Sequence, residues 1–99
     1  MPPAVSAECE RARNLLFLSR PTLWPTWPYL PLMRRRPGQE EEYGVLYDAF
    51  NVSGKTGYSS TVLLSNLFQV PSTEDELLAL PHETYDSPEE IYDADWRVD

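Results

Sequence analysis

A chain of 99 residues is long enough for one small domain and too short for two useful cores. Its apolar fraction of 41% and its ten prolines predict a thin core and short helices. A net charge of −8 disfavours general binding to nucleic acid or to anionic membranes, so we expect neither as a partner.

Charge is segregated along the chain. Residues 1–36 carry six arginines and two glutamates, whereas residues 74–99 carry ten acidic residues and one arginine. The acidic end would be attracted to the basic front of the same molecule or to a basic partner. We expect residues 82–99 to be an acidic tail docked on the single domain, because Tyr92 and Trp96 share one helical face.

Cysteine content and hydropathy indicate a compartment. Cys9 is the single cysteine, so there is no internal disulfide framework, which suits a reducing compartment. The apolar run 15–18 is too short for a signal-peptide core or a membrane span. We therefore expect a cytoplasmic protein.

Residues 5–19 have the pattern of an amphipathic helix. Val5, Cys9, Ala12 and Leu16 recur at spacings of four, three and four, which places them on one face. This stripe predicts the packed side of the helix, with Cys9 as a buried thiol and the last turn buried as well. The alternative is a helix face that binds a partner.

Residues 21–37 are rich in proline and tryptophan. Prolines at 25, 28 and 31 recur every third residue, and large apolar residues at 24, 27, 30 and 33 share that period. This predicts an extended segment like a polyproline II helix, with edge strand as the alternative. Trp24 and Trp27 would then pack over the sheet or form a ridge that binds a partner.

An arginine triplet and a glutamate triplet flank a turn signal. Arg34, Arg35 and Arg36 are followed by Pro37-Gly38 and then by glutamates at 40–42. The two arms of a hairpin would bring these opposite charges together across the strands. The alternative is a phosphate site on the arginines.

Three runs predict an antiparallel meander with strands at about 29–36, 43–50 and 58–66. In the second run Val45 and Tyr47 share one face and Leu46 lies on the other, which predicts a central strand covered on both sides. In the third run Val62 and Leu63 likewise fall on opposite faces.

Two short helices are predicted after residue 71. Thr73 and Glu76 form one capping box, and Ser87 and Glu90 form another, with Pro88 in the first turn. Together these elements predict an α+β fold that has an N-terminal helix, the proline-rich segment, the meander and two C-terminal helices.

One stretch resembles a chemical motif. Residues 49–56 match the pattern of a P-loop, in which Lys55 would meet phosphate and Thr56 would meet magnesium. However, Ala49 replaces the usual first glycine, and the residues after Thr56 start a helix poorly. A polar hairpin loop is the favoured interpretation, and phosphate or nucleotide binding is the alternative.

No other set of residues points to a reaction. Cys9 and His82 are the one cysteine–histidine pair, and the acidic residues lack the spacing of a metal loop. We therefore expect no metal, no cofactor and no enzymatic activity. The predicted function is a small interaction module whose partner is a protein, bound through Trp24, Trp27, Tyr29, Arg34, Arg35 and Arg36.

Overall fold

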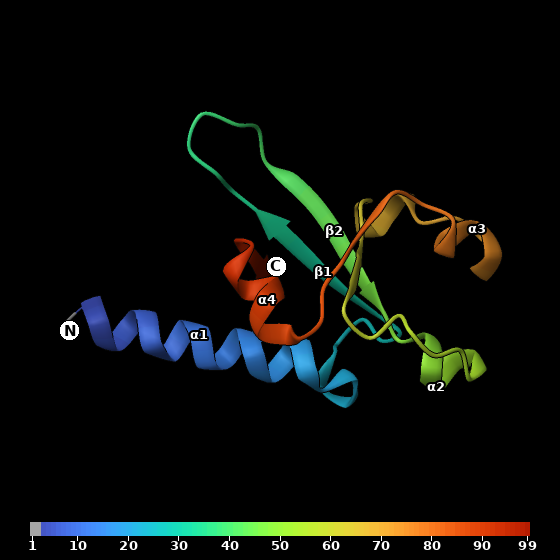
Figure 1. Cartoon of the computed structure of the whole chain (residues 1–99), viewed down its shortest axis with the longest axis horizontal. Coiled ribbons are helices and arrows are strands. Elements are labelled where there is room, and N and C mark those ends of the chain that lie inside the picture. The colour runs from blue at the N-terminus through green and yellow to red at the C-terminus, as the bar shows by residue number, and fades with distance from the viewer. Residues whose placement is uncertain (1–2) are drawn as a thin grey trace.

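The computed structural model describes residues 3–99, and side-chain burial from Glu8 onward (Figure 1). Its five strands form one antiparallel sheet in the order β4–β3–β2–β1–β5. The strands are β1 (Tyr29–Arg34), β2 (Glu42–Tyr47), β3 (Thr61–Leu63), β4 (His82–Thr84) and β5 (Trp96–Val98). The α-helices are α1 (Pro3–Ser19), α2 (Ala49–Ser53), α3 (Glu74–Leu78) and α4 (Pro88–Asp93), and two 3-10 turns are η1 (Pro21–Leu23) and η2 (Leu67–Gln69).

The α+β class is confirmed, whereas the predicted strand count is wrong. β1, β2 and β3 are neighbours in the expected order, but β3 spans Thr61–Leu63 and not residues 58–66, and β4 and β5 extend the sheet at its two edges. Both added strands come from residues 82–99, which we expected to be a tail docked on the sheet. Three-residue strands carry little alternation, so the sequence pattern gave no signal for them.

β1 lies inside the sheet although it contains Pro31. β5 pairs with Leu32–Arg34, and beyond that register the Pro31 carbonyl accepts a hydrogen bond from Asp99 N at 3.1 Å. The N–H and C=O of one residue in a strand point to the same side, so an N–H at position 31 would face β5 and not β2. The proline therefore costs no bond in the ladder to β2, and the expectation of an edge position is corrected.

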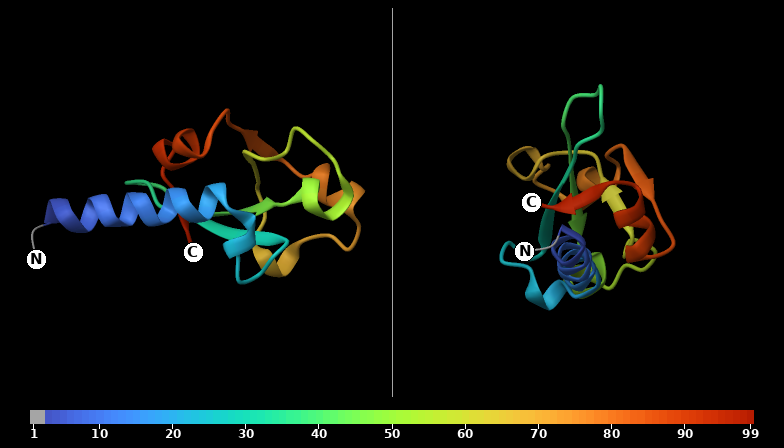
Figure 2. Two further views of the ribbon diagram at one scale, coloured as in Figure 1. Left: turned by 90° about the horizontal axis from the view of Figure 1, so that it is seen from below. Right: turned by 90° about the vertical axis from the view of Figure 1, so that its left-hand side faces the viewer.

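The sheet has an apolar cluster on each face. One cluster joins Leu46, Val62 and Trp96 of the sheet to Leu18 of α1 and Ile91 of α4, two helices that lie side by side in Figure 2. The second cluster joins Val45, Tyr47 and Leu63 to Ala49 of α2 and Leu77 of α3. The predicted assignment of neighbouring residues to opposite faces, and the central place of β2, are both confirmed.

Gly44 permits a close approach at the centre of the sheet. A Cβ atom at this position would lie 2.5 Å from Cγ1 of Val62 and 3.2 Å from the ring of Trp96. Both neighbours are fully buried, so neither can move away. The absence of a side chain at Gly44 is therefore what lets the Trp96 ring lie against β2.

The N-terminal helix is present, but its predicted buried stripe is wrong. Cys9, Ala12 and Leu16 are exposed, and the buried side is formed by Asn14 and Leu18 in the last turns. Val5 lies among the residues whose side chains are not described. The last turn, which we predicted to be buried, is buried in part: Leu18 is buried and Leu15 and Phe17 are half-buried, whereas Leu16 is exposed. Among the helices of residues 3–99, none has the length and apolar character needed to cross a bilayer.

The proline-rich segment is not a polyproline II ridge. Residues 21–23 form η1 and residues 25–28 form a turn before β1 begins. As a result Trp24 is buried in the core, whereas Trp27 is 49% exposed. The turns supply two backbone hydrogen bonds, from Trp24 N to Pro21 O and from Trp27 N to Trp24 O. A polyproline II helix has no internal hydrogen bonds, so the turns are favoured over it.

Local signals at helix starts were more reliable than strand lengths. The caps are confirmed, since the Thr73 hydroxyl accepts from Glu76 N and the Ser87 hydroxyl accepts from Glu90 N, both at 3.3 Å.

The second predicted strand is too long, because residues 49–53 form α2, whose C-cap is Gly54 with a φ of +75°. Gly54 adopts this left-handed conformation without the steric cost that other residues would incur.

Replacement of Ile91 by alanine tests whether the C-terminal segment belongs to the folding unit. Ile91 has no exposed surface, so the cavity left behind should lower the free energy of unfolding by about 2–5 kcal/mol. Phe68→Ala is the control, because Phe68 is 95% exposed and its loss should change stability by less than about 0.5 kcal/mol. Equal urea midpoints for the two variants would show that the segment is not part of the cooperative core.

Candidate functional site

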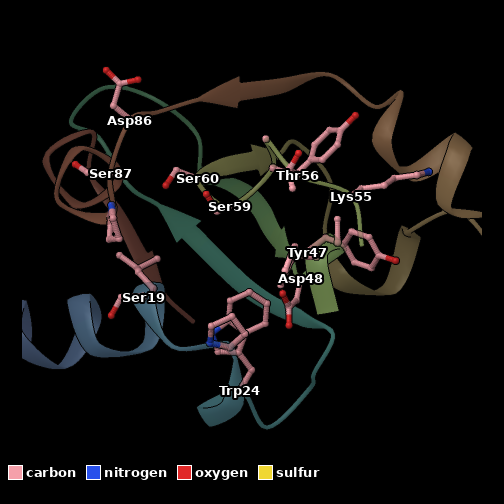
Figure 3. A pocket seen from close by; sticks show the side chains of 17 residues that line it. Ser19, Trp24, Tyr47, Asp48, Lys55, Thr56, Ser59, Ser60, Asp86 and Ser87 are labelled. Carbon is pink, nitrogen blue, oxygen red and sulfur yellow. The ribbon is translucent and has the colours of Figure 1, made fainter. Parts of the chain in front are cut away.

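A cavity of about 460 Å³ opens beside the end of α1 (Figure 3). Segments far apart in the sequence form its wall. They are residues 18–24 at and after the end of α1, residues 47–50 at the end of β2, the loop 55–60, and residues 86–88 at the start of α4. The volume lies within the range of small-ligand pockets, ~300–1,000 Å³. It also suits a single large side chain of a bound protein.

Aromatic and aliphatic groups fill much of the cavity wall. Leu18 and Trp24 belong to the cluster on one face of the sheet, while Tyr47 and Ala49 belong to the cluster on the other. The Trp24 indole is fixed by a hydrogen bond from its Nε1 to Phe17 O at 2.6 Å. The apolar wall is therefore pre-formed by the core itself.

Polar groups are placed at the edges of this apolar wall. Asp48, which is buried, accepts hydrogen bonds on Oδ2 from Trp27 Nε1 and from Asn51 Nδ2, each at 2.8 Å. Asp86 also lines the cavity, next to Ser87, and Figure 3 shows its carboxylate turned away from the other labelled side chains. Hydroxyl groups of the loop 55–60 complete the lining. An apolar pocket with a few oriented polar groups is the usual form of a binding site.

Two exposed aromatic residues stand beside the cavity. Phe50 lines it and is 63% exposed, and Trp27 is joined to it through Asp48. Aromatic side chains are enriched at protein–protein interfaces relative to the rest of a protein surface. We call the cavity together with Phe50 and Trp27 the cavity face.

The structure separates the residues that we predicted to bind a partner. Trp24 lies in the cavity wall and Trp27 at its edge, whereas the half-buried Tyr29 packs on Tyr47 with ring centroids 5.5 Å apart. Arg35 and Arg36 follow the far end of β1, roughly 20 Å along a six-residue strand from Trp27. One continuous binding ridge from the tryptophans to the arginines is therefore not formed.

Arg34 is buried within the fold. Its guanidinium is 4% exposed, donates to both carboxylate oxygens of Glu83 at 3.0 Å and also pairs with Glu42. It lies over the Trp96 ring, 4.2 Å from the centroid. Burial opposes its charge, yet the hydrogen bonds that it donates to the two glutamates, together with their negative charge, outweigh this and raise the pKa of Arg34. The structure thus corrects the interpretation of Arg34 as a surface contact.

The other two arginines lie at the hairpin end, as expected. Arg35 pairs with Glu41 at 3.2 Å and Arg36 pairs with Glu42 at 3.1 Å. The predicted pairing of opposite charges across the turn is confirmed. Because Arg35 is largely exposed, its pair adds little stability, about 0–1 kcal/mol.

The P-loop-like stretch has neither the loop geometry nor the free lysine of that motif. Residues 49–53 form α2 before the glycine, and no helix follows Thr56, so no helix start points at a phosphate. Lys55 Nζ lies 2.6 Å from Glu74 Oε1 and 3.5 Å from Asp75 Oδ1, and Figure 3 shows it pointing away from the cavity. The predicted hairpin loop is also corrected, because α2 occupies half of it.

Further chemistry-bearing residues are scattered. Cys9 is exposed on α1, which corrects the expectation of a buried thiol, and α1 packs near β5 at one edge of the sheet. His82 lies on β4 at the other edge, so the two do not meet. Within the described part of the chain no group of three or more potential metal ligands comes together.

Comparisons of the chain with protein-family models, with curated proteins and with solved structures find no match. The candidate site is therefore defined by its own residues. Sequence reasoning identified Trp24 and Trp27 but missed Asp48, Phe50 and Asp86. Ser87-Pro88 indicated the start of α4. Its proximity to α1 arises because the chain crosses from β4 at one edge of the sheet to β5 at the other, and no local sequence pattern indicates this crossing.

The ion pair between buried Arg34 and half-buried Glu83 predicts how stability depends on pH. Hydrogen bonds from Arg34, against some burial, lower the pKa of Glu83 from 4.5 to about 2. A carboxylate with a depressed folded pKa stabilises the fold above its unfolded pKa, and this contribution is lost as pH falls from about 4.5 to about 2. Glu83→Gln should therefore flatten the acid-unfolding curve in that window and lower the free energy of unfolding at pH 7 by about 1–3 kcal/mol.

Glu41→Gln is the matched control. Its partner Arg35 is 69% exposed, so we expect a loss of no more than about 1 kcal/mol and an acid transition like that of the parent chain. Chemical unfolding at several pH values measures both. The same acid transition in parent and Glu83→Gln chains would show that the Arg34–Glu83 pair does not control it.

Proposed function

We propose that the protein is a small non-enzymatic interaction module that binds a partner protein through the cavity face. The observation that supports this most is the pre-formed, mainly apolar cavity flanked by exposed Phe50 and Trp27. An anchor side chain of the partner would fill the cavity, and the two aromatic residues would pack around it. This keeps Trp24 and Trp27 from the sequence-based prediction and adds Phe50.

Charge favours a basic partner segment. The chain carries a net charge of −8, and Asp48 and Asp86 are both among the residues that line the cavity. Lys55 also lines the cavity, but its amine is taken up by Glu74. Complementary charge raises association rates and discriminates against acidic competitors. We further propose a cytoplasmic location, which the single cysteine supports.

Affinity capture with paired phenylalanine variants tests the module. Phe50→Ser removes an exposed aromatic residue from the cavity face and should weaken partner binding roughly tenfold or more. Phe68→Ser removes an exposed phenylalanine outside this cavity, so its captured proteins should match those of the parent chain. The capture uses native lysate with mass spectrometry, followed by titration with the purified partner.

Equal partner binding by the parent chain and both variants would contradict the proposed surface. Binding should also weaken with added salt, since the partner is expected to be basic. An acidic partner whose binding is insensitive to salt would remove the electrostatic part of the proposal.

A phosphate- or nucleotide-binding protein is the second candidate, because Lys55 and Thr56 line the same cavity. Its test is the melting temperature with ATP or GTP and magnesium. Since Glu74 already holds the Lys55 amine, we expect no saturable shift. A saturable shift that Lys55→Ala abolishes would favour this candidate over the first.

A further inference from the structure

The outward face of α1 carries an apolar stripe that nothing in the described chain covers. Cys9 and Ala12 are exposed, and Leu16 is 42% exposed. In Figure 1 the first half of α1 extends past the rest of the molecule, and in the left view of Figure 2 the helix lies in front of it. Most of the stability of a helix in a protein comes from packing of its apolar side, so a partner that covers this stripe would stabilise α1.

Contacts on the opposite side show which face of α1 points inward. Glu10 pairs with Arg97 at 3.6 Å, the Arg11 guanidinium lies 5.8 Å from the Tyr92 ring, and Asn14 Oδ1 accepts from Val98 N at 2.7 Å. At 3.6 residues per turn, positions 9, 12 and 16 then lie on the far side of the helix. The stripe is therefore directed away from the body and from the cavity face.

We propose that α1 pairs with the α1 helix of a second copy of this chain, parallel and in register, through Cys9, Ala12 and Leu16. Their spacings of three and four are those of the a and d positions of a heptad repeat, and Val5 continues the spacing toward the N-terminus. Small side chains at 9 and 12 let two helices approach closely. Leu16 supplies the larger apolar contact.

Charges beside the stripe select a second copy and a parallel orientation. With Cys9 and Leu16 at a positions, Glu8 falls at g and Arg13 at e, and both are exposed. In a parallel pair, g of one helix faces e of the next heptad in its partner, so Glu8 meets Arg13 of the other copy twice. In an antiparallel pair, g faces g and e faces e, and these charges do not meet.

The orientation also fixes where the cysteines lie. In the parallel register Cys9 faces Cys9 of the second copy at the same level, within reach of a disulfide. In the antiparallel register Cys9 would lie opposite Ala12. The stripe from Cys9 to Leu16 spans little more than one heptad. Its area is therefore smaller than the ~800 Å² per partner of a standard interface, and we expect a weak, concentration-dependent dimer.

Sedimentation and oxidation of the full chain test the pairing. In reducing buffer the chain should shift from monomer to dimer as concentration rises into the high micromolar range, and Ala12→Glu should keep it monomeric. Diamide, which accepts the two electrons and two protons lost by a pair of thiols, should give a dimer that dithiothreitol reverses. Cys9→Ser is the control for cross-linking and should leave the reversible dimer.

A charge exchange tests register and orientation. Glu8→Arg and Arg13→Glu each replace two attractions by two repulsions and should each weaken dimerisation roughly tenfold. The double variant restores the pairs with their signs exchanged and should recover most of the affinity. Melting curves should be alike for all monomers, because these side chains are exposed.

Three results would overturn the pairing. They are a monomer at every concentration, cross-linking that Ala12→Glu leaves unchanged, and a double charge variant no better than either single one. None of these measurements involves the cavity face, so the pairing and the proposed module can fail separately.

Discussion

The fold depends on one packed aromatic ring, that of Trp96. It has no exposed surface and lies against Gly44 of β2, beneath the guanidinium of Arg34 on β1, and donates from Nε1 to Glu83 of β4 at 3.3 Å. A residue three positions from the C-terminus thus connects four strands. The indole also shields the Arg34–Glu83 pair from water, which strengthens that pair and raises the cost of losing either partner.

The same constraint explains where the cavity lies. β5 runs beside β1, so the chain after β4 has to cross to the far edge of the sheet, and α4 lies on that path against α1. The crossing brings residues 86–88 into the same cavity wall as the end of α1 and Asp48 at the end of β2. The cavity is the space that remains between these ends, and its apolar wall is the outer surface of the core.

Signals within a few residues of one another predicted the fold well, and long-range pairings were predicted poorly. The two capping boxes, the charged hairpin and the two faces of β2 each depend on side chains close together in sequence or directly paired across a turn. The edge strands β4 and β5 have three residues each and are held by contacts with β3 and β1 far away in the chain. Their stability comes from tertiary packing, which overrides weak local preference.

The stripe of α1 shows why an amphipathic pattern does not say what covers it. The spacing of Cys9, Ala12 and Leu16 was correctly taken as one helix face, but the core uses the face of Asn14 and Leu18 instead. The buried face includes Asn14, whose side-chain oxygen accepts the Val98 N–H that extends the hydrogen bonding of β5. A buried backbone N–H without an acceptor costs free energy. A polar side chain that accepts from such an N–H can therefore favour its own side of a helix for packing over a more apolar side.

The two proposed surfaces lie on different sides of α1, and this separation has a functional consequence. Leu18 on the inner side lines the cavity, whereas the stripe faces outward, so a parallel pair leaves both cavities open. In the proposed pair, two cavities joined through a helix pair would bind a partner with repeated anchor segments more tightly than either alone, provided the spacing fits. A weak dimer is then sufficient, because a bivalent partner itself holds the two copies together.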